Sequence, residues 1–166
     1  EALHLVQLRF AFNDQLGKSD MILNGENVEA EIRQMYVSEK VSEVAAIGSV
    51  RDFAVAQQKL MGASKGIVMD GRDIGTVVFP NAELKIFVTA DPAIRVQRRF
   101  LELQNTNPSI RKEDIEANLK HRDLMDTTRE RSPLKQAQDA IVLDNTHMTK
   151  EEQMNLALSW ALAKIG

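Results

Sequence analysis

Residues 69–80 read MDGRDIGTVVFP, and the character of the chain changes abruptly here. The apolar run GIVM, residues 66–69, stops at Asp70, and a second apolar run follows Gly75. Two acids, an arginine and two glycines therefore stand where a buried strand is expected to end. In open parallel sheets, ligands bind beyond the carboxyl ends of the strands. The stretch is interpreted either as a ligand-binding loop or as an ordinary turn with solvated charges.

The side chains of this loop suit a polar ligand. Arg72 offers a planar fork that matches phosphate, and Asp73 offers an acceptor for an amino group or a ribose hydroxyl. Gly71 and Gly75 let the backbone turn sharply and approach a ligand closely.

Strands and helices alternate through the rest of the chain. Three short apolar runs predict strands: GIVM, LKIFVTA at 84–90 and AIVLDN at 140–145. Asp91 and Pro92 are the start signals of a helix, and Thr149 with Glu152 forms the capping box of the last helix. Another helix is expected at roughly 111–130. Strands that are apolar on both faces and separated by helices indicate a parallel sheet covered on both sides.

The opening third has a different pattern. Residues 4–12 alternate near their end and are predicted to form a strand, and Asn24-Gly25 is the turn signal of a tight hairpin. Apolar positions then recur at helical spacing over 28–46 and 50–61. Ser49 is the expected cap of the second helix.

Composition excludes several classes of protein. The chain has 166 residues and no cysteine, which rules out a disulfide framework or a thiolate metal site within it and fits a reducing cytosol. Its apolar runs are too short to span a bilayer. A net charge of −3, with one Tyr and one Trp, argues against a nucleic-acid partner.

Positive charge is concentrated in one segment. Residues 95–131 hold most of the arginines, which indicates either a small anionic ligand or a solvated helix face. Arg95, Arg98 and Arg99 recur at helical spacing, so they face either the same cleft or water.

Farther along, KHRDLMDTTRER spans residues 120–131. On a helix, Arg122, Asp126 and Arg129 would project from one face, at positions i, i+4 and i+7. They are interpreted as intrahelical ion pairs or as a clamp that balances charge on a transferring phosphoryl group.

The strings GIVMDGRDIGTVVFPNAELKIFVTA, RVQRRFLELQ and KHRDLMDTTRERSPL resemble bacterial cytidylate kinases. The resemblance extends upstream through ILNGENVEAEIRQMYVSEKVSEVAAIGSVR and downstream to AIVLDNT, so it covers nearly everything from Ile22 onward. The string GRD-x-GTVVFP is specific to this family among nucleoside monophosphate kinases.

The resemblance implies transfer of the γ-phosphoryl group of ATP, bound with Mg²⁺, to CMP or dCMP in cytoplasmic pyrimidine metabolism. The implied fold is α/β and adenylate-kinase-like, of the P-loop NTPase type, with a parallel sheet flanked by helices. Residues 1–62 would form the CMP-binding insert, which is antiparallel β plus helical. Residues 63–166 would form the rest of the kinase core, with a short lid at about 98–112.

Family roles carry over to individual positions of this sequence. The residues that would read the cytosine edge are Ser42, Arg51 and Asp73. Arg72 and Arg129 would bind phosphates, and Arg122 and Asp126 would hold the pentose and the approaching phosphates. The expected catalytic group is Arg122, Asp126 and Arg129. The arginines assigned to the lid are Arg95, Arg98 and Arg99, and the resemblance assigns no metal ligand to this chain.

One departure from the family is large. The phosphate-loop motif G-x-x-x-x-G-K-[ST] does not occur; Gly17-Lys18-Ser19 lacks the earlier glycine, whose place is taken by Phe12. The chain is therefore expected to be the C-terminal part of a longer kinase that lacks its first core strands, and to be inactive alone. Self-association or a complementing N-terminal segment would cover the sheet edge. The alternatives are a nucleotide-binding module without catalysis and a kinase for another monophosphate such as UMP.

Overall fold

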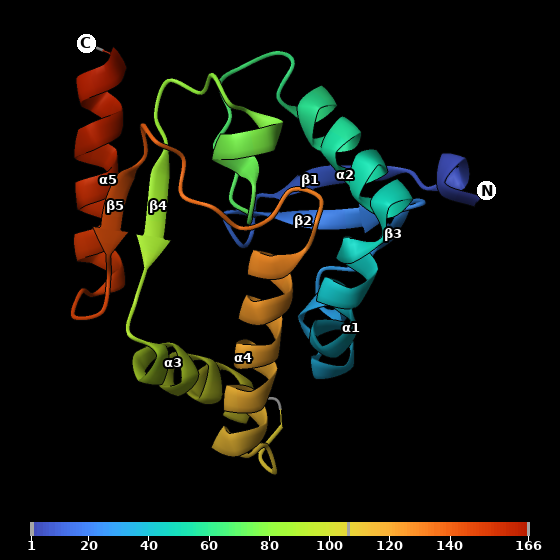
Figure 1. Ribbon diagram of the computed structural model, residues 1–166, viewed down its shortest axis with the longest axis vertical. Helices are drawn as coiled ribbons and strands as arrows, with labels where there is room; N and C mark the ends of the chain where they lie inside the picture. The colour runs from blue at the N-terminus through green and yellow to red at the C-terminus, as the bar shows by residue number, and fades with distance from the viewer. Residues whose placement is uncertain (1, 106, 166) are drawn as a thin grey trace. The chain divides into compact units, whose positions relative to one another are not determined.

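The computed structural model describes residues 2–105 and 107–165, which form two compact units (Figure 1). The first unit comprises the residues up to Ile67 together with Arg129–Arg131. The second unit comprises Val68–Thr128 and the residues from Ser132 onward.

The first unit contains a three-stranded antiparallel sheet. After the short 3₁₀ helix η1 (Ala2–Leu5), the strands β1 (Leu8–Asn13), β2 (Lys18–Leu23) and β3 (Glu26–Asn27) pair in the order β1-β2-β3. Asn24 and Gly25 join β2 to β3 with φ values of 50° and 91°. Both values lie in the left-handed region that a tight hairpin turn requires, so the predicted turn is confirmed.

Helices make up the rest of the first unit. The helix predicted over 28–46 is wrong in its first part, because η2 (Glu31–Arg33) is a 3₁₀ turn. Gln34 then has extended backbone, and α1 (Met35–Ala46) begins after it. The next helix, α2 (Gly48–Met61), begins at Gly48, so Ser49 lies inside it and is not its cap.

The second unit has an α/β fold. Strands β4 (Ile86–Thr89) and β5 (Ile141–Asp144) pair in parallel. The helices are α3 (Pro92–Gln104), α4 (Lys112–Thr128) and α5 (Lys150–Ile165), and the π-helical turn η3 (Ile74–Val78) precedes β4. The Asp91 side chain accepts hydrogen bonds from the amides of Ala93 and Ile94, which confirms the predicted start of α3.

The predicted sheet differs from the observed one in extent. GIVM, residues 66–69, forms no strand, and Val68 is fully exposed. A strand needs a neighbour to receive its ladder hydrogen bonds, and within the described ranges β4 and β5 pair only with each other. Val88 and Val142 are about half exposed (56% and 48%), so these strands are not covered on both faces.

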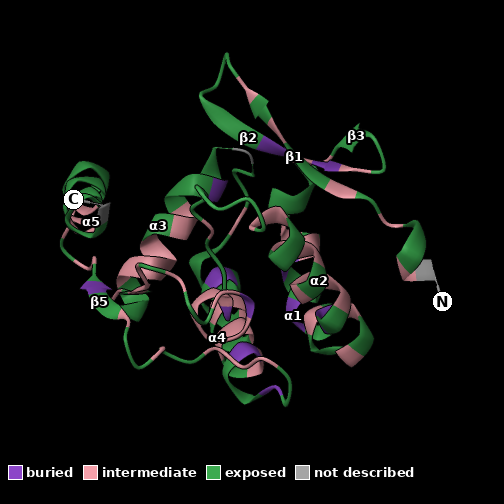
Figure 2. Ribbon diagram, turned by 90° about the horizontal axis from the view of Figure 1, so that it is seen from above, coloured by how far each residue is buried: buried purple, intermediate pink, exposed green. Residues whose placement is uncertain are grey.

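Few of the described residues are buried (Figure 2), and more of the buried ones are polar than hydrophobic. The buried hydrophobic residues in the described ranges are Ile22, Val78, Leu103, Ile115 and Leu143. The buried polar residues are Asp20, Ser38, Ser42, Arg51, Asp73, Asp126 and Arg129. Charged side chains are seldom buried without partners or a task, and most of this second set are predicted site residues. No helix of the described residues is long and apolar enough to cross a bilayer.

Candidate active site

The loop at 69–80 folds back on itself as a π-helical turn. The backbone carbonyl of Asp73 accepts hydrogen bonds from the amides of Val77 (2.9 Å) and Val78 (3.3 Å), and the carbonyl of Ile74 accepts one from Phe79 (2.7 Å). The second apolar run therefore turns tightly directly after the charged residues. π-Helical turns are rare in proteins, and those that occur are often found at functional sites. Asp73, at the start of the turn, is only 2% exposed.

The two glycines of this loop are required by close packing inside the protein. A Cβ placed on Gly71 would lie 2.9 Å from Cγ1 of Ile74, and one on Gly75 would lie 3.3 Å from Cδ of Lys85. Neither glycine has the positive φ that would demand glycine on conformational grounds. These side chains lie in the direction that a Cβ would take, and the interpretation that the glycines let the backbone approach a ligand remains a prediction.

Lys85 anchors the far end of the same loop, although no sequence signal marks it. Its ammonium donates to both carboxylate oxygens of Asp139 (2.8 and 2.9 Å) and to the carbonyl of Pro80. The hydrogen bond from Lys85 also lowers the pKa of the Asp139 carboxyl below its usual range. The loop is thus fixed at Pro80 by a residue that lies just before β4.

Arg72 and Asp126 connect this loop to α4. The Nε atom of Arg72 lies 2.9 Å from Oδ2 of Asp126. The Asp126 side chain is 5% exposed and the Arg72 side chain 36%, so the carboxylate is buried while the guanidinium reaches toward solvent. Asp126 therefore has an ion-pair partner from outside its own helix, which helical spacing alone could not predict.

Arg122 brings a second guanidinium to the same place. Burial lowers the pKa of Arg122, and the like charge of Arg72 lowers it further, while Asp126 opposes the shift. An arginine that is partly buried beside another arginine is stabilised by any additional negative charge. Arg72, Arg122 and Asp126 therefore form a cationic cluster, which suits an anionic group such as phosphate.

Arg129 does not share the helical face predicted for it. Helix α4 ends at Thr128, and Arg129 groups with the first unit, whereas Arg122 and Asp126 belong to the second. The helix stops because Pro133 is close: the residue before a proline disfavours helical backbone, and Ser132 has a φ of 51°. The expectation that all three residues project from one helix is therefore wrong for Arg129.

The first unit holds the other predicted substrate residues. Ser42 lies in α1 and Arg51 in α2, and both side chains are buried, as is that of Arg129. The Nη2 atom of Arg51 donates to Oε1 of Gln58, about two turns farther along α2, at 3.4 Å. The base-reading and phosphate-binding roles of these residues remain predictions.

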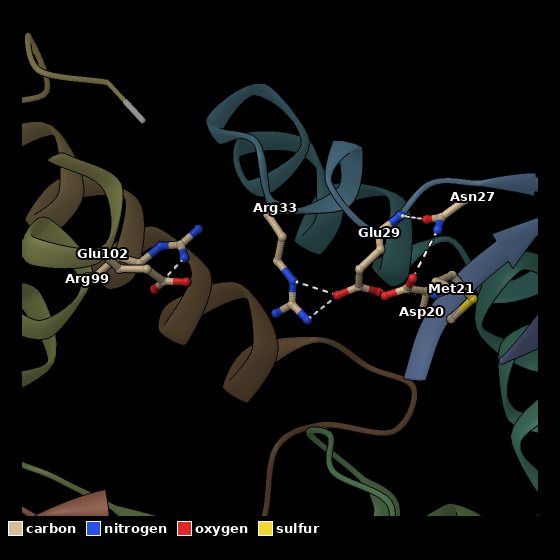
Figure 3. Close-up of polar contacts among 7 residues, drawn as sticks. All are labelled: Asp20, Met21, Asn27, Glu29, Arg33, Arg99 and Glu102. Carbon is tan, nitrogen blue, oxygen red and sulfur yellow. Dashed lines mark hydrogen bonds and ion pairs between the residues drawn. The ribbon is translucent and has the colours of Figure 1, made fainter. Parts of the chain in front are cut away.

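The arginines assigned to the lid all have partners within the second unit. Arg95 forms a two-pronged ion pair with Asp123 (2.5 and 3.1 Å), which joins α3 to α4. Arg98 donates to the side chain and carbonyl of Asn145 (2.8 and 2.7 Å), after β5. Arg99 pairs with Glu102 at 2.7 Å (Figure 3). The predicted lid segment, 98–112, contains the end of α3, the connection that follows it and the first residue of α4, Lys112. Residue 106 of this segment lies outside the described residues.

A polar network in the first unit was not anticipated from the sequence (Figure 3). Buried Asp20 accepts hydrogen bonds from the side-chain amides of Asn13 and Asn27, both at 3.1 Å. Glu29 accepts from the amide of Met21 and from the guanidinium of Arg33. These donors lower the pKa values of the Asp20 and Glu29 carboxyls. The network ties the hairpin to the turn η2, and the signal that could have revealed it is an acid, Asp20, directly before the apolar residues that end β2.

These observations define a class of protein: an α/β protein with buried acids and arginines arranged for an anionic ligand. A family model described as Cytidylate kinase matches residues 1–161. The chain belongs to the cytidylate kinase family, whose members are nucleoside monophosphate kinases and thus phosphotransferases.

Curated relatives agree with this assignment. The chain is 56% identical to a cytidylate kinase of Parabacteroides distasonis, over 92% of this chain and 66% of that protein. It is 56% identical to one of Flavobacterium johnsoniae, over 95% and 69%. It is 51% identical to one of Cytophaga hutchinsonii, over 99% and 70%. The chain thus spans about two thirds of the length of these relatives.

Proposed function

We propose that this chain supplies the acceptor site of a cytidylate kinase, which transfers the γ-phosphoryl group of ATP to CMP or dCMP. The observation that carries the proposal is the cationic cluster: Arg72 of the GRD loop pairs with buried Asp126, and Arg122 lies close enough for the charges of both to affect its pKa. Family membership supports this proposal. We infer a cytoplasmic location, where ATP and nucleoside monophosphates are available.

Each group has a chemical task in this proposal. The guanidinium of Arg72 binds the acceptor phosphate, and Asp126 holds that guanidinium in place through the 2.9 Å ion pair. Arg122 adds positive charge near the oxygens on which negative charge accumulates during transfer. Asp73 accepts a hydrogen bond from the base, for which its buried position is suited, because water does not compete there.

ATP would enter with Mg²⁺, which would supply positive charge that offsets the negative charge of its phosphates. Within the described residues, no group of three His, Cys, Asp or Glu residues is arranged to hold a metal ion. The carboxylate within the cationic cluster, that of Asp126, is already engaged by Arg72. In this proposal, the residues of this chain therefore contact the phosphates and not the metal ion.

The printed sequence contains no phosphate-loop motif, so we expect the donor phosphates to be held by residues other than these 166. The relatives, of which the chain covers about two thirds, are long enough to include such a segment. In a coupled assay with ATP and CMP, the isolated chain should form no CDP. Turnover by the chain alone would contradict this part of the proposal.

Calorimetry with CMP tests the acceptor site. Wild-type chain should bind CMP, and Asp73→Ala and Arg129→Ala should each weaken binding by roughly 1.5–3 kcal/mol, the value of a charge-assisted hydrogen bond. UMP serves as the comparison, because it differs from CMP at the base edge that Asp73 would read. Equal affinity for CMP and UMP would favour a kinase of broader specificity. Absence of any nucleotide binding would refute the acceptor site in this chain.

A further inference from the structure

Three residues that leave α4, Arg129–Arg131, belong to the first compact unit. Arg131 fastens this segment to the start of α2. Its guanidinium forms an ion pair with Asp52. It also lies against Gly48, so that a Cβ on that glycine would come within 3.2 Å of Cζ and Nη1 of Arg131. Gly48 and Asp52 both lie in the first turns of α2, and one arginine therefore contacts this helix end twice.

Two residues next to these contacts in the sequence are predicted to bind the substrate. Arg129 is two positions before Arg131, and Arg51 immediately precedes Asp52. Both Arg51 and Arg129 are 8% exposed, so they are held within the unit rather than extended into solvent. Arg129 is the expected phosphate ligand, and Arg51 is expected to read the cytosine edge.

We propose that Arg131 is a positioning residue: it fastens the 129–131 segment to α2, so that Arg129 and Arg51 are held in one rigid body. The inference rests on the proposed function, and it adds that recognition of the base and of the phosphate are energetically coupled through this contact. Arg131 acts through Arg129 and contacts no substrate itself.

Arg131 would act by reducing the conformational entropy that the 129–131 segment loses on ligand binding, rather than by stabilising the fold. The side chains of Arg131 and Asp52 are 57% and 66% exposed, and exposed ion pairs contribute little to folding free energy. A segment that is already fixed loses less conformational freedom when its ligand arrives. If Arg51 and Arg129 are rigidly linked, a ligand bound through its base to one already has its phosphate beside the other. The gain in affinity therefore appears only with a ligand that has both a base and a phosphate.

Calorimetry with two ligands, CMP and cytidine, isolates this effect in the 166-residue chain. The ratio of the cytidine Kd to the CMP Kd measures what the phosphate adds. Arg131→Gln should lower that ratio about threefold, as the loss of an exposed ion pair allows, while the cytidine Kd stays unchanged. Arg131→Lys keeps the charge opposite Asp52 and should recover part of the ratio. A merely structural role would raise both Kd values together and leave the ratio as it was, which would overturn the proposal.

Two further variants separate position from stability. Gly48→Ala inserts a methyl group against the Arg131 guanidinium, yet alanine is the better helix former. This variant should melt no lower than wild type and should still lower the ratio. Lys40→Gln is the matched control, because it removes another exposed ion pair of the first unit, to Glu43 in α1, and it should leave the ratio unchanged.

Hydrogen exchange tests the fastening without any nucleotide. Arg131→Gln should speed amide exchange in residues 129–131, and Lys40→Gln should not. Unchanged exchange in Arg131→Gln would overturn the fastening itself. Failure of wild-type chain to bind CMP would instead overturn the proposed function and the base–phosphate coupling with it, while faster exchange would still support the fastening.

Discussion

Arg72, from the loop at 69–80, and Asp126, from α4, form an ion pair of 2.9 Å around which the candidate site is organised. The pair is asymmetric, because the carboxylate is buried and the guanidinium is partly exposed. An arginine held in this way keeps donors available for an incoming anion, since a guanidinium has five N–H groups and one carboxylate cannot engage them all. The pair therefore leaves the cluster with a net positive charge, to which Arg122 contributes, and in the proposed function this charge binds the acceptor phosphate.

Replacing Asp126 by Asn should destabilise the fold and abolish tight CMP binding. The substitution removes the negative charge that offsets those of Arg72 and Arg122, and we expect the free energy of unfolding to fall by about 1–3 kcal/mol, as when a buried charged partner is lost. Urea denaturation followed by circular dichroism measures this change. Lys40→Gln, which removes the exposed pair with Glu43, should change the same quantity by less than about 0.5 kcal/mol. Equal midpoints for Asp126→Asn and wild type would contradict the role of the pair.

Replacing Gly71 by Ala should destabilise the loop for a purely steric reason. The new Cβ would lie 2.9 Å from Cγ1 of Ile74, closer than real contacts allow, and we expect a loss of about 1–3 kcal/mol. The double variant Gly71→Ala, Ile74→Ala should cost less than the sum of the two single variants, because Ile74→Ala removes the obstructing atoms. The stabilities of wild type, the two single variants and the double variant, measured by thermal melting, complete this double-mutant cycle. Strict additivity would show that Gly71 is required for another reason.

Stability should fall in acid, in part through Asp123. The hydrogen bond from Arg95 holds the pKa of the Asp123 carboxyl below its usual range. A carboxyl whose pKa is lower in the folded state stabilises that state above its unfolded pKa of about 3.9. This stabilisation is lost as the pH falls through the lower folded value. Urea midpoints between pH 7 and pH 2 should therefore decline mainly below about pH 4.

Asp123→Asn is the variant that tests this assignment. It should be less stable than wild type at pH 7 and should lose less stability between pH 4 and pH 2. Asp14→Asn, at an exposed turn position, should track wild type throughout. If Asp123→Asn and wild type declined in parallel over the acid range, the Arg95–Asp123 pair would not be the cause.

We further expect the chain to associate with itself at high concentration. Val88 on β4 and Val142 on β5 are about half exposed, and within the described ranges the two strands pair only with each other. Unpaired strand edges bind other strands. Sedimentation velocity over a concentration series should show association, which Val142→Lys should weaken. Asn155→Lys, which adds the same charge at an exposed position of α5, is the control. A monomer at every concentration would refute this expectation.

Local signals in the sequence predicted local structure well. The Asn24-Gly25 turn, the start of α3 at Asp91 and the capping box of α5 all form as expected. In the capping box, Thr149 Oγ1 accepts from the amide of Glu152 (3.1 Å), whose carboxylate accepts from the amide of Thr149 (2.7 Å). Each of these features depends on hydrogen bonds between residues a few positions apart, so the sequence alone contains all the partners.

Features that depend on distant partners were not predictable in this way. The expected strand at 66–69 does not form, because a strand also needs a neighbour in space, which its own residues cannot specify. The contacts of the loop glycines with the side chains of Ile74 and Lys85 were likewise not predicted, because both depend on how the loop folds.

By itself, then, the sequence determined the family, the Asn24-Gly25 turn, the starts of α3 and α5, and which arginines and acids deserve study, because these are encoded in residue type and short spacing. Only the tertiary structure decided how those residues are grouped. It paired Asp126 with Arg72, ended α4 before Arg129, and fastened Arg131 to the start of α2. The physical reason is that ion pairs and packing contacts act through space, between residues whose separation along the chain carries no periodic signal.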